Sequence, residues 1–248
     1  MESIEFEKMI FGLDVRVFEK ISSQTTGSDR RSLLFLQREV RGANPSYVYL
    51  EIGSHLGGSI QPYLLDRKCS KIYSIDKRST SQPDERCEED LGYPGNTTER
   101  MLQNLRSITG DVSRVVCIDG DVSSIDMAQV DQSPDICLID GEHTNKAVIR
   151  DFNFCKLVLN EDGLIVFHDA NVVAAGLKKI VRGLKESGER FGSCYFSTSI
   201  FVLVFGAKYD DLKKLRLRSF AAKVKMMLSG MLPEPVRVAI LRLVRRHH

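Results

Sequence analysis

Short apolar runs, each followed by an acidic residue, alternate with amphipathic segments from residue 46 onward. The first run is Tyr47–Leu50, which leads directly into Glu51. Runs of this length, rich in β-branched and aromatic residues, predict buried strands. Further runs of the same kind cover 71–76, 115–121, 134–140 and 163–169, and residues 194–206 add one or two strands that can pair antiparallel at a sheet edge.

Amphipathic segments lie on both sides of the first run and between the later ones. Helical spacing of apolar residues predicts helices over 3–21 and 29–42, with Ser28 or Asp29 as the N-cap of the second. Three more helices are expected over 58–67, 97–109 and 144–159. Strand–helix alternation this regular predicts an α/β, Rossmann-like fold: a mainly parallel seven-stranded sheet with helices on both faces.

The chain is long enough for one large core. It has 248 residues, of which 42% are hydrophobic. We expect an N-terminal helical cap over 1–44, an α/β domain over 45–207 and a basic helical tail over 208–248. The polar segment 77–96 is too long for an ordinary connection. Such a segment is either functional or disordered, and composition leaves both interpretations open.

The formal net charge of +2 hides an uneven distribution, because residues 208–248 carry 11 Lys or Arg and only 3 Asp or Glu. Apolar residues recur among them at helical spacing, which predicts basic amphipathic helices broken at Pro233 and Pro235. This pattern fits a solvated face packed on the domain or on a second copy in a homo-oligomer. It also fits peripheral binding to an anionic membrane or a lipid-linked glycan. Nucleic acid is disfavoured, because no stacking platform or recognisable binding motif accompanies the charge.

The N-terminal stretch is acidic and lacks the basic and apolar regions of a signal peptide. No run approaches 18 apolar residues, so we expect no membrane span. The six cysteines lack zinc-type spacing, which fits core thiols in a reducing compartment. We therefore expect a cytoplasmic protein, membrane-peripheral if the tail binds lipid.

The turn after the first strand suggests a ligand. Its spacing, Gly53-x-x-x-Gly57-Gly58, differs from the GxGxxG of dinucleotide-binding folds. Glu51 precedes it by two residues, and a carboxylate there would repel a pyrophosphate. It suits a cationic ligand without phosphate, such as S-adenosylmethionine, whose ribose hydroxyls Asp76 could bind at the end of the second strand.

Several motifs together carry a family resemblance. LEIGSHLGGS, YSIDKR, IDGDV, DICLIDGEHTNKAVIRDF and GLIVFHDAN resemble class I S-adenosylmethionine-dependent methyltransferases, and most closely the small-molecule and sugar O-methyltransferases of macrolide, aminocoumarin and cephalosporin biosynthesis. The resemblance covers about residues 45–206, and IDGEH followed by FHD is its most specific part. It implies that Glu51 lies near the ammonium of the cofactor or supports the glycine loop. The other residues that it assigns to the cofactor are Gly53, Ser54, Gly57, Asp76, Gly120, Asp121, Val122 and Asp140.

Some of these residues also have a structural interpretation. Gly57 and its neighbour Gly58 could serve only close packing of a helix on a strand, and Asp121 could serve only to cap a turn. The resemblance assigns Gly53 and Ser54 to the methionine part of the cofactor. It assigns Asp76 to the ribose, residues 120–122 to the adenine and Asp140 to the neighbourhood of the methyl group.

Methyl transfer to a hydroxyl requires that the hydroxyl lose its proton. The segment Asp140-Gly-Glu-His143 places an acid and an imidazole at one strand exit, and His168-Asp169-Ala-Asn171 places further ligands at the next. His143 is the candidate general base because its ordinary pKa lies near neutrality. The alternative is that it caps a helix or bonds to Asp140. Asp140 is the second catalytic candidate.

The resembling sugar O-methyltransferases hold a divalent cation, usually magnesium, with acids at the ends of strands four and five. Asp140 and Asp169 match this pattern, His168 replaces one acid, and Asn171 could supply an oxygen. These four residues are the predicted metal ligands, with Mg²⁺ favoured over Mn²⁺. The sequence thus predicts an S-adenosylmethionine-dependent O-methyltransferase for a hydroxyl of a sugar, glycan or other small molecule. The alternatives are a methyltransferase for protein or nucleic acid, and a non-catalytic module that keeps the cofactor fold.

Overall fold

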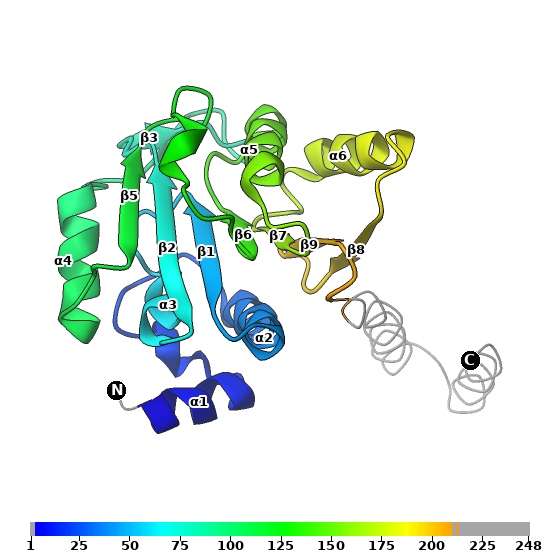
Figure 1. The fold of residues 1–248 in the computed structure, drawn as a ribbon. Coiled ribbons are helices and arrows are strands. Elements are labelled where there is room, and N and C mark those ends of the chain that lie inside the picture. The colour runs from blue at the N-terminus through cyan, green and yellow to red at the C-terminus, as the bar shows by residue number, and fades with distance from the viewer. Residues whose placement is uncertain (1–2, 210–211, 213–248) are drawn as a thin grey trace, which may run out of the picture. The chain divides into compact units, whose positions relative to one another are not determined.

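The computed structural model describes residues 3–209 and residue 212, and within them it confirms a seven-stranded sheet (Figure 1). The spatial order is β5-β2-β1-β6-β7-β9-β8. Six strands are parallel, and β9 runs antiparallel to both of its neighbours. The strands are β1 (Tyr47–Ile52), β2 (Cys69–Asp76), β5 (Val115–Asp119), β6 (Ile136–Ile139), β7 (Leu164–Phe167), β8 (Phe191–Tyr195) and β9 (Phe201–Phe205).

The register brings the strand exits to one edge of the sheet. Asp76 at the end of β2 lies opposite Asp119 of β5, and Ile52 at the end of β1 lies opposite Ile139 of β6. Ile139 in turn lies opposite Phe167 of β7. The acidic residues that follow the central strands in the sequence are therefore neighbours in space, as a parallel sheet requires.

Helices cover both faces of the sheet, because the side chains of β1 alternate between two apolar environments. Val48, Leu50 and Ile52 belong to the core cluster that includes α5 and α6. On the opposite face, Tyr49 stacks on Tyr63 of α3, with ring centroids 3.5 Å apart. The helices are α1 (Ser3–Gly12), α2 (Gly27–Ala43), α3 (Gln61–Leu65), α4 (Thr98–Thr109), α5 (Asn145–Val158) and α6 (Ala174–Glu186), with 3-10 turns at Val15–Phe18 and Met127–Gln129.

The N-terminal helices differ from the prediction in two respects. The first helix ends at Gly12 instead of continuing to residue 21, because Leu13 has a φ of 53° and Asp14 caps a separate 3-10 turn. The N-cap of α2 is Thr26, so the predicted caps Ser28 and Asp29 are wrong. Thr26 and Asp29 form a reciprocal capping box, in which Asp29 occupies the third helical position.

Later elements also depart from the prediction. The crossover helix α3 is shorter than 58–67, although Pro62 does lie in its first turn. The sequence pattern missed α6 entirely. Segment 77–96 is folded and contains a two-stranded antiparallel pair, β3 (Ser81–Gln82) with β4 (Leu91–Gly92).

The predicted basic tail, 208–248, lies outside the described residues except for 208, 209 and 212. Of the helices formed by the described part of the chain, none combines the length and apolar character needed to cross a membrane.

Candidate functional site

A cavity of about 370 Å³ opens at the carboxyl edge of the parallel strands. Its walls come from the loops after β1, β2, β6 and β7, from segment 77–96 and from the turn that leads into α2. The predicted site residues that line it are Gly53, Ser54, Asp76, Asp140, His143, His168, Asp169 and Asn171. The fold therefore gathers most of the predicted cofactor, catalytic and metal residues around one space.

A smaller hollow adjoins the first and shares Gly53 and Asp76 with it. The residues predicted to contact adenine, Gly120, Asp121 and Val122, line this second space. Lys77 lies beside it, with its ammonium 2.8 Å from Asp121 and 2.9 Å from Glu142. Asp76, the predicted ribose ligand, therefore borders both spaces.

Gly53 allows two loops to approach closely. Its φ of 91° lies in the region that favours glycine, and a Cβ there would collide with the backbone carbonyl of Asp140. Gly57 has a different environment. It is absent from the lining of both cavities, and a Cβ on it would press against Met101 and Leu105 of α4. This position favours the packing interpretation of Gly57.

Asp76 is buried, and the surrounding backbone holds its carboxylate in place. Oδ2 accepts a hydrogen bond from the His55 amide at 2.8 Å, and Oδ1 accepts one from the Arg78 amide at 2.7 Å. Asn96 donates a third from its side chain, at 3.1 Å. The Arg78 guanidinium also lies 3.6 Å from Oδ2, so protein groups surround most of the roughly four acceptor sites of this carboxylate.

Glu51 lies beneath the loop and is absent from the lining of both cavities. It is fully buried, and both Tyr49, at 2.9 Å, and Ser59 donate hydrogen bonds to it. Burial raises the pKa of Glu51 from an ordinary 4.5 to about 8, although these two hydrogen bonds act in the opposite direction. This placement favours support of the loop over direct contact with a ligand.

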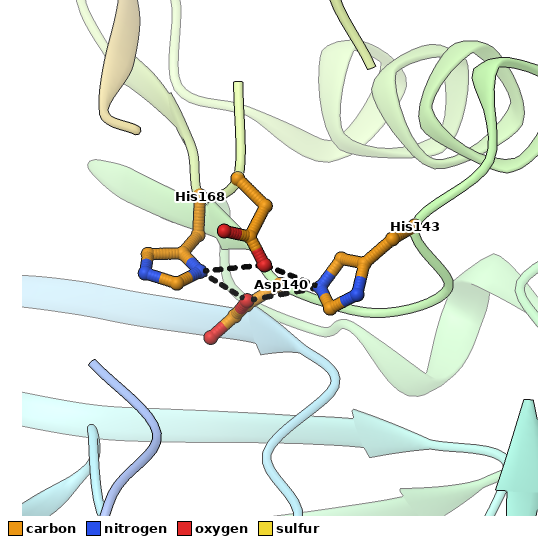
Figure 2. A group of neighbouring side chains, drawn as sticks. Asp140, His143 and His168 are labelled. Atoms are coloured by element: carbon orange, nitrogen blue, oxygen red, sulfur yellow. Dashed lines mark ion pairs between the residues drawn. The ribbon is translucent and has the colours of Figure 1, made fainter. Parts of the chain in front are cut away.

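Four side chains converge at the exits of β6 and β7, and we call them the 140/143/168/169 cluster. Each can direct one nitrogen or oxygen atom to a common point, with these atoms all within 4.8 Å of one another. Figure 2 shows the rings of His143 and His168 on opposite sides of Asp140. Nδ1 of His168 lies 2.8 Å from Asp140, and Nε2 of His143 lies 3.2 Å from Asp169.

The other nitrogen of each ring faces a second carboxylate, and sequence reasoning assigned neither of these carboxylates to the site. Asp84, from segment 77–96, lies 2.8 Å from Nδ1 of His143. Asp29, from the first turn of α2, lies 3.6 Å from Nε2 of His168. Arg86 links segment 77–96 to the loop after β7, because its guanidinium contacts Asp84 at 2.6 Å and Asp169 at 3.3 Å. In the sequence, only the length and polarity of 77–96 pointed to the site, and Asp29 was recognised only as a candidate helix cap.

The crowded carboxylates control the charge of the rings. Burial opposes the charged form of His168, but Asp140, Asp29 and Asp169 outweigh it and raise the pKa of His168 to about 11. Burial likewise opposes the charge of Asp140, yet the two histidines lower its pKa to about 2. The pKa of His143 is also raised, because Asp140, Asp84 and Asp169 outweigh burial. The cluster therefore favours positive charge between its acids.

Residues 50–170, which contain the glycine loop and the cluster, match the family model described as "Methyltransferase domain". These residues are an S-adenosylmethionine-dependent methyltransferase domain. The sequence-based recognition of this family is confirmed. The chain also resembles "Uncharacterized protein R132" of Acanthamoeba polyphaga mimivirus, at 27% identity over 121 residues. That match covers 49% of this chain and 50% of the viral protein.

Solved structures share the fold of the methyltransferase domain. The O-methyltransferase NovP superposes with a TM-score of 0.58 at 13% identity, covering 83% of this chain and 99% of NovP. The calicheamicin methyltransferase CalS11 superposes with a TM-score of 0.54 at 14% identity, covering 84% of this chain and 95% of CalS11. MycE from the mycinamycin pathway, in complex with Mg and SAH, superposes with a TM-score of 0.51 at 17% identity. This superposition covers 80% of this chain and 55% of MycE. At these identities the likeness establishes the fold.

Proposed function

We propose that this chain transfers the methyl group of S-adenosylmethionine to a hydroxyl of a polyhydroxylated small molecule, with a sugar as the acceptor class. One observation carries the choice of acceptor: the segment that precedes α2 and the loop between β8 and β9 line the cavity with hydroxyl and amide side chains. These are Ser22, Ser23, Gln24, Thr26, Thr198 and Ser199. Ligand cavities are usually lined mainly by apolar groups, so this lining favours an acceptor with many hydrogen-bonding groups.

The cofactor assignment rests on fit. A cavity of about 370 Å³ lies within the usual range for small-molecule sites, and it joins the hollow at residues 120–122 beside Asp76. Gly53 lines both spaces, and its lack of a Cβ lets the loop after β6 pack against the loop after β1. The turn after β1 lacks the GxGxxG spacing that dinucleotide-binding folds use to hold a pyrophosphate. These features support S-adenosylmethionine over a dinucleotide.

The reaction is an in-line displacement, in which the acceptor oxygen bonds to the methyl carbon as the carbon–sulfur bond breaks. The hydroxyl must lose its proton. The family resemblance assigns Asp140 to the neighbourhood of the methyl group, which supports placing the 140/143/168/169 cluster at the reacting atoms. Asp84 and the Arg86 guanidinium lie 2.8 Å and 2.9 Å from Nδ1 of His143, so Nε2 is the nitrogen left for chemistry. Nε2 can serve either as the proton acceptor predicted from the sequence or as the ligand of a cation. We assign activation of the hydroxyl to the cluster as a whole.

Magnesium fits this cluster poorly. The MycE structure contains Mg, and the sequence pattern also favoured Mg²⁺. Magnesium prefers oxygen ligands in octahedral geometry, whereas two of the four donors here are imidazole nitrogens. The proposed reaction therefore includes no step that requires magnesium.

The deciding experiment is incubation of the purified chain with S-adenosylmethionine and sugar nucleotides, free glycosides or phenols. We expect S-adenosylhomocysteine to form with a polyhydroxylated acceptor, and proton NMR to show a new O-methyl group. Calorimetric titration should show binding of S-adenosylmethionine and none of NAD. Transfer to phenols alone would refute the sugar assignment, and binding of NAD alone would refute the cofactor assignment.

The charge of the basic tail supports a second proposal, which concerns a binding partner. Residues 208–248, with 11 basic and 3 acidic residues, would bring the domain to an anionic surface such as a membrane carrying the acceptor. The test is cosedimentation with vesicles containing phosphatidylserine, using the full chain and a chain ending at residue 209. Equal cosedimentation of the two chains would refute it.

A further inference from the structure

We propose that Asp140, His143, His168 and Asp169 form a site for a first-row transition-metal dication such as Mn²⁺, Co²⁺ or Zn²⁺, with both histidines as ligands. This inference deepens the proposed function, since it concerns the site where we place the reaction. It departs from the sequence-based prediction in two respects. The preferred cation is not Mg²⁺, and His143 is a ligand in place of a general base.

The distances between donor atoms fit a coordination shell. Nδ1 of His168 lies 2.8 Å from Asp140 Oδ1 and 3.6 Å from Asp169 Oδ2. Nε2 of His143 lies 3.7 Å and 3.2 Å from the same two oxygens. Donors bonded to one ion at ~2.0–2.2 Å are separated by about 2.8–3.6 Å at neighbouring corners of an octahedron or tetrahedron. Each histidine thus meets both carboxylates at about the spacing that a shared ion requires.

Ring nitrogens that lack hydrogen bonds give an independent indication. His143 and His168 are each only 8% exposed, yet three of their ring nitrogens make no hydrogen bond of good geometry. One is Nε2 of His168, which faces Asp29, and the other two are Nε2 of His143 and Nδ1 of His168. Buried polar atoms in folded proteins nearly always have a partner, so unpaired ones call for an explanation. Nε2 of His143 and Nδ1 of His168 point into the cluster, where a cation would satisfy them together.

The outer partners of the rings complete the pattern. Metal-binding histidines usually donate their second ring N–H to a carboxylate, which fixes the tautomer and the ring orientation. Asp84 lies 2.8 Å from Nδ1 of His143, and the Arg86 guanidinium lies 2.9 Å from the same nitrogen. Asp29 faces Nε2 of His168 at 3.6 Å, which is beyond hydrogen-bond distance. These carboxylates come from two separate segments, 77–96 and α2, so the arrangement does not arise from one local turn.

Charge and ligand chemistry select the class of cation. Four carboxylates surround the two rings, whereas Arg86 supplies one fixed positive charge among these groups. Imidazole nitrogen binds Mn²⁺, Co²⁺ and Zn²⁺ more strongly than it binds Mg²⁺. A bound dication of this class lowers the pKa of a coordinated hydroxyl, which is the activation that the proposed reaction needs.

The test measures metal binding to the metal-free full chain without S-adenosylmethionine. Isothermal titration with Co²⁺, Zn²⁺ and Mg²⁺ should show one site, with Co²⁺ or Zn²⁺ bound at least ~100-fold more tightly than Mg²⁺. The visible spectrum of bound Co²⁺ reports nitrogen ligands directly. Equal affinity for Co²⁺ and Mg²⁺, or no binding of any of the three ions, would overturn the inference.

Variants identify the ligands. His168→Asp should lower the preference for Co²⁺ over Mg²⁺ at least ~10-fold, because it replaces nitrogen by oxygen. The matched control is His55→Asn, which removes the third histidine of the cavity, outside the cluster, and should leave metal binding unchanged. Asp84→Asn keeps all four ligands and should weaken Co²⁺ binding ~10–100-fold through ring orientation.

Circular dichroism and binding of S-adenosylmethionine establish that each variant is folded. An unchanged metal preference in folded His168→Asp, or equal losses in His168→Asp and His55→Asn, would overturn the inference. Methyl transfer that persists after exhaustive chelation, in a chain that binds no metal, would refute the metal site and leave the proposed function standing. Selective Co²⁺ binding without methyl transfer to any acceptor would support the metal site and refute the proposed function.

Discussion

Nδ1 of His143 lies 2.8 Å from Oδ2 of Asp84, and this contact joins segment 77–96 to the loop between β6 and α5. The backbone follows the same path, since the amide of Glu85 donates to the carbonyl of His143 at 3.1 Å. Asp84 is almost fully buried. A segment that sequence composition could not distinguish from a disordered loop therefore forms one wall of the cavity and holds a ring at its centre.

Arg86 should matter for both activity and stability. Its guanidinium bridges Asp84 and Asp169, and the Asp84 side chain is only 1% exposed. Replacement by Gln should lower the free energy of unfolding by about 1–3 kcal/mol, because the buried carboxylate of Asp84 loses a charged hydrogen-bond partner. We expect kcat/KM for methyl transfer to fall ~10-fold or more, because the wall formed by 77–96 loses its link to Asp169. Arg67→Gln, at an exposed arginine outside the cavity, is the control, and an equal effect of both variants would contradict the prediction.

His143→Ala should abolish turnover and leave the affinity for S-adenosylmethionine within ~3-fold of the unaltered chain. The ring lies among the carboxylates of the cluster, away from residues 120–122, so cofactor binding loses no contact there. Steady-state kinetics and calorimetry measure the two quantities. Co²⁺ titration of the same variant separates the two roles of His143: a ligand predicts weakened metal binding, whereas a general base predicts unchanged metal binding.

Gly53→Ala should remove cofactor binding. The position has a φ of 91°, and the added Cβ would meet the carbonyl of Asp140, so the loops after β1 and β6 must separate. We expect a loss of several kcal/mol in the free energy of unfolding, as for strained backbone in a packed site. Gly42→Ala in α2 is the control, because its Cβ meets nothing within 4 Å and the change should stabilise the helix by ~0.5–1 kcal/mol. Chemical denaturation and calorimetry test both variants.

Glu51 should give the protein a stability that falls as the pH rises. Burial raises its pKa from 4.5 to about 8, so between these values the folded chain holds a proton that the unfolded chain has lost. The contribution is complete below pH 4.5 and is lost as the pH rises through 8, with a slope of at most ~1.4 kcal/mol per pH unit.

Glu51→Gln removes this ionisation, so its advantage in free energy of unfolding over the unaltered chain should grow from pH 5 to pH 8. Urea denaturation across that range measures it. Parallel pH profiles for the two proteins would show that Glu51 does not titrate in this window.

The local sequence pattern determined much of the framework. Alternating apolar runs and amphipathic segments predicted the seven strands and the helices α2, α4 and α5, because one strand or helix leaves its signature in a short window of sequence. The acids at the strand exits predicted a shared edge, since parallel strands must end together. Local backbone detail was predicted less well, and the N-cap Thr26 and the break after Gly12 show where side-chain bonding competes with periodicity.

Only the tertiary structure decided which atoms of the site meet. Asp29 and Asp84 are far from His168 and His143 in the chain, and no local pattern pairs an acid with a ring across such separations. The sequence placed Glu51 at a cofactor loop, but its burial, which follows from packing against Tyr49 and Ser59, placed it underneath that loop. The residue types fixed the available chemistry. Long-range packing assigned each ring nitrogen its partner, because distance and burial depend on the whole fold.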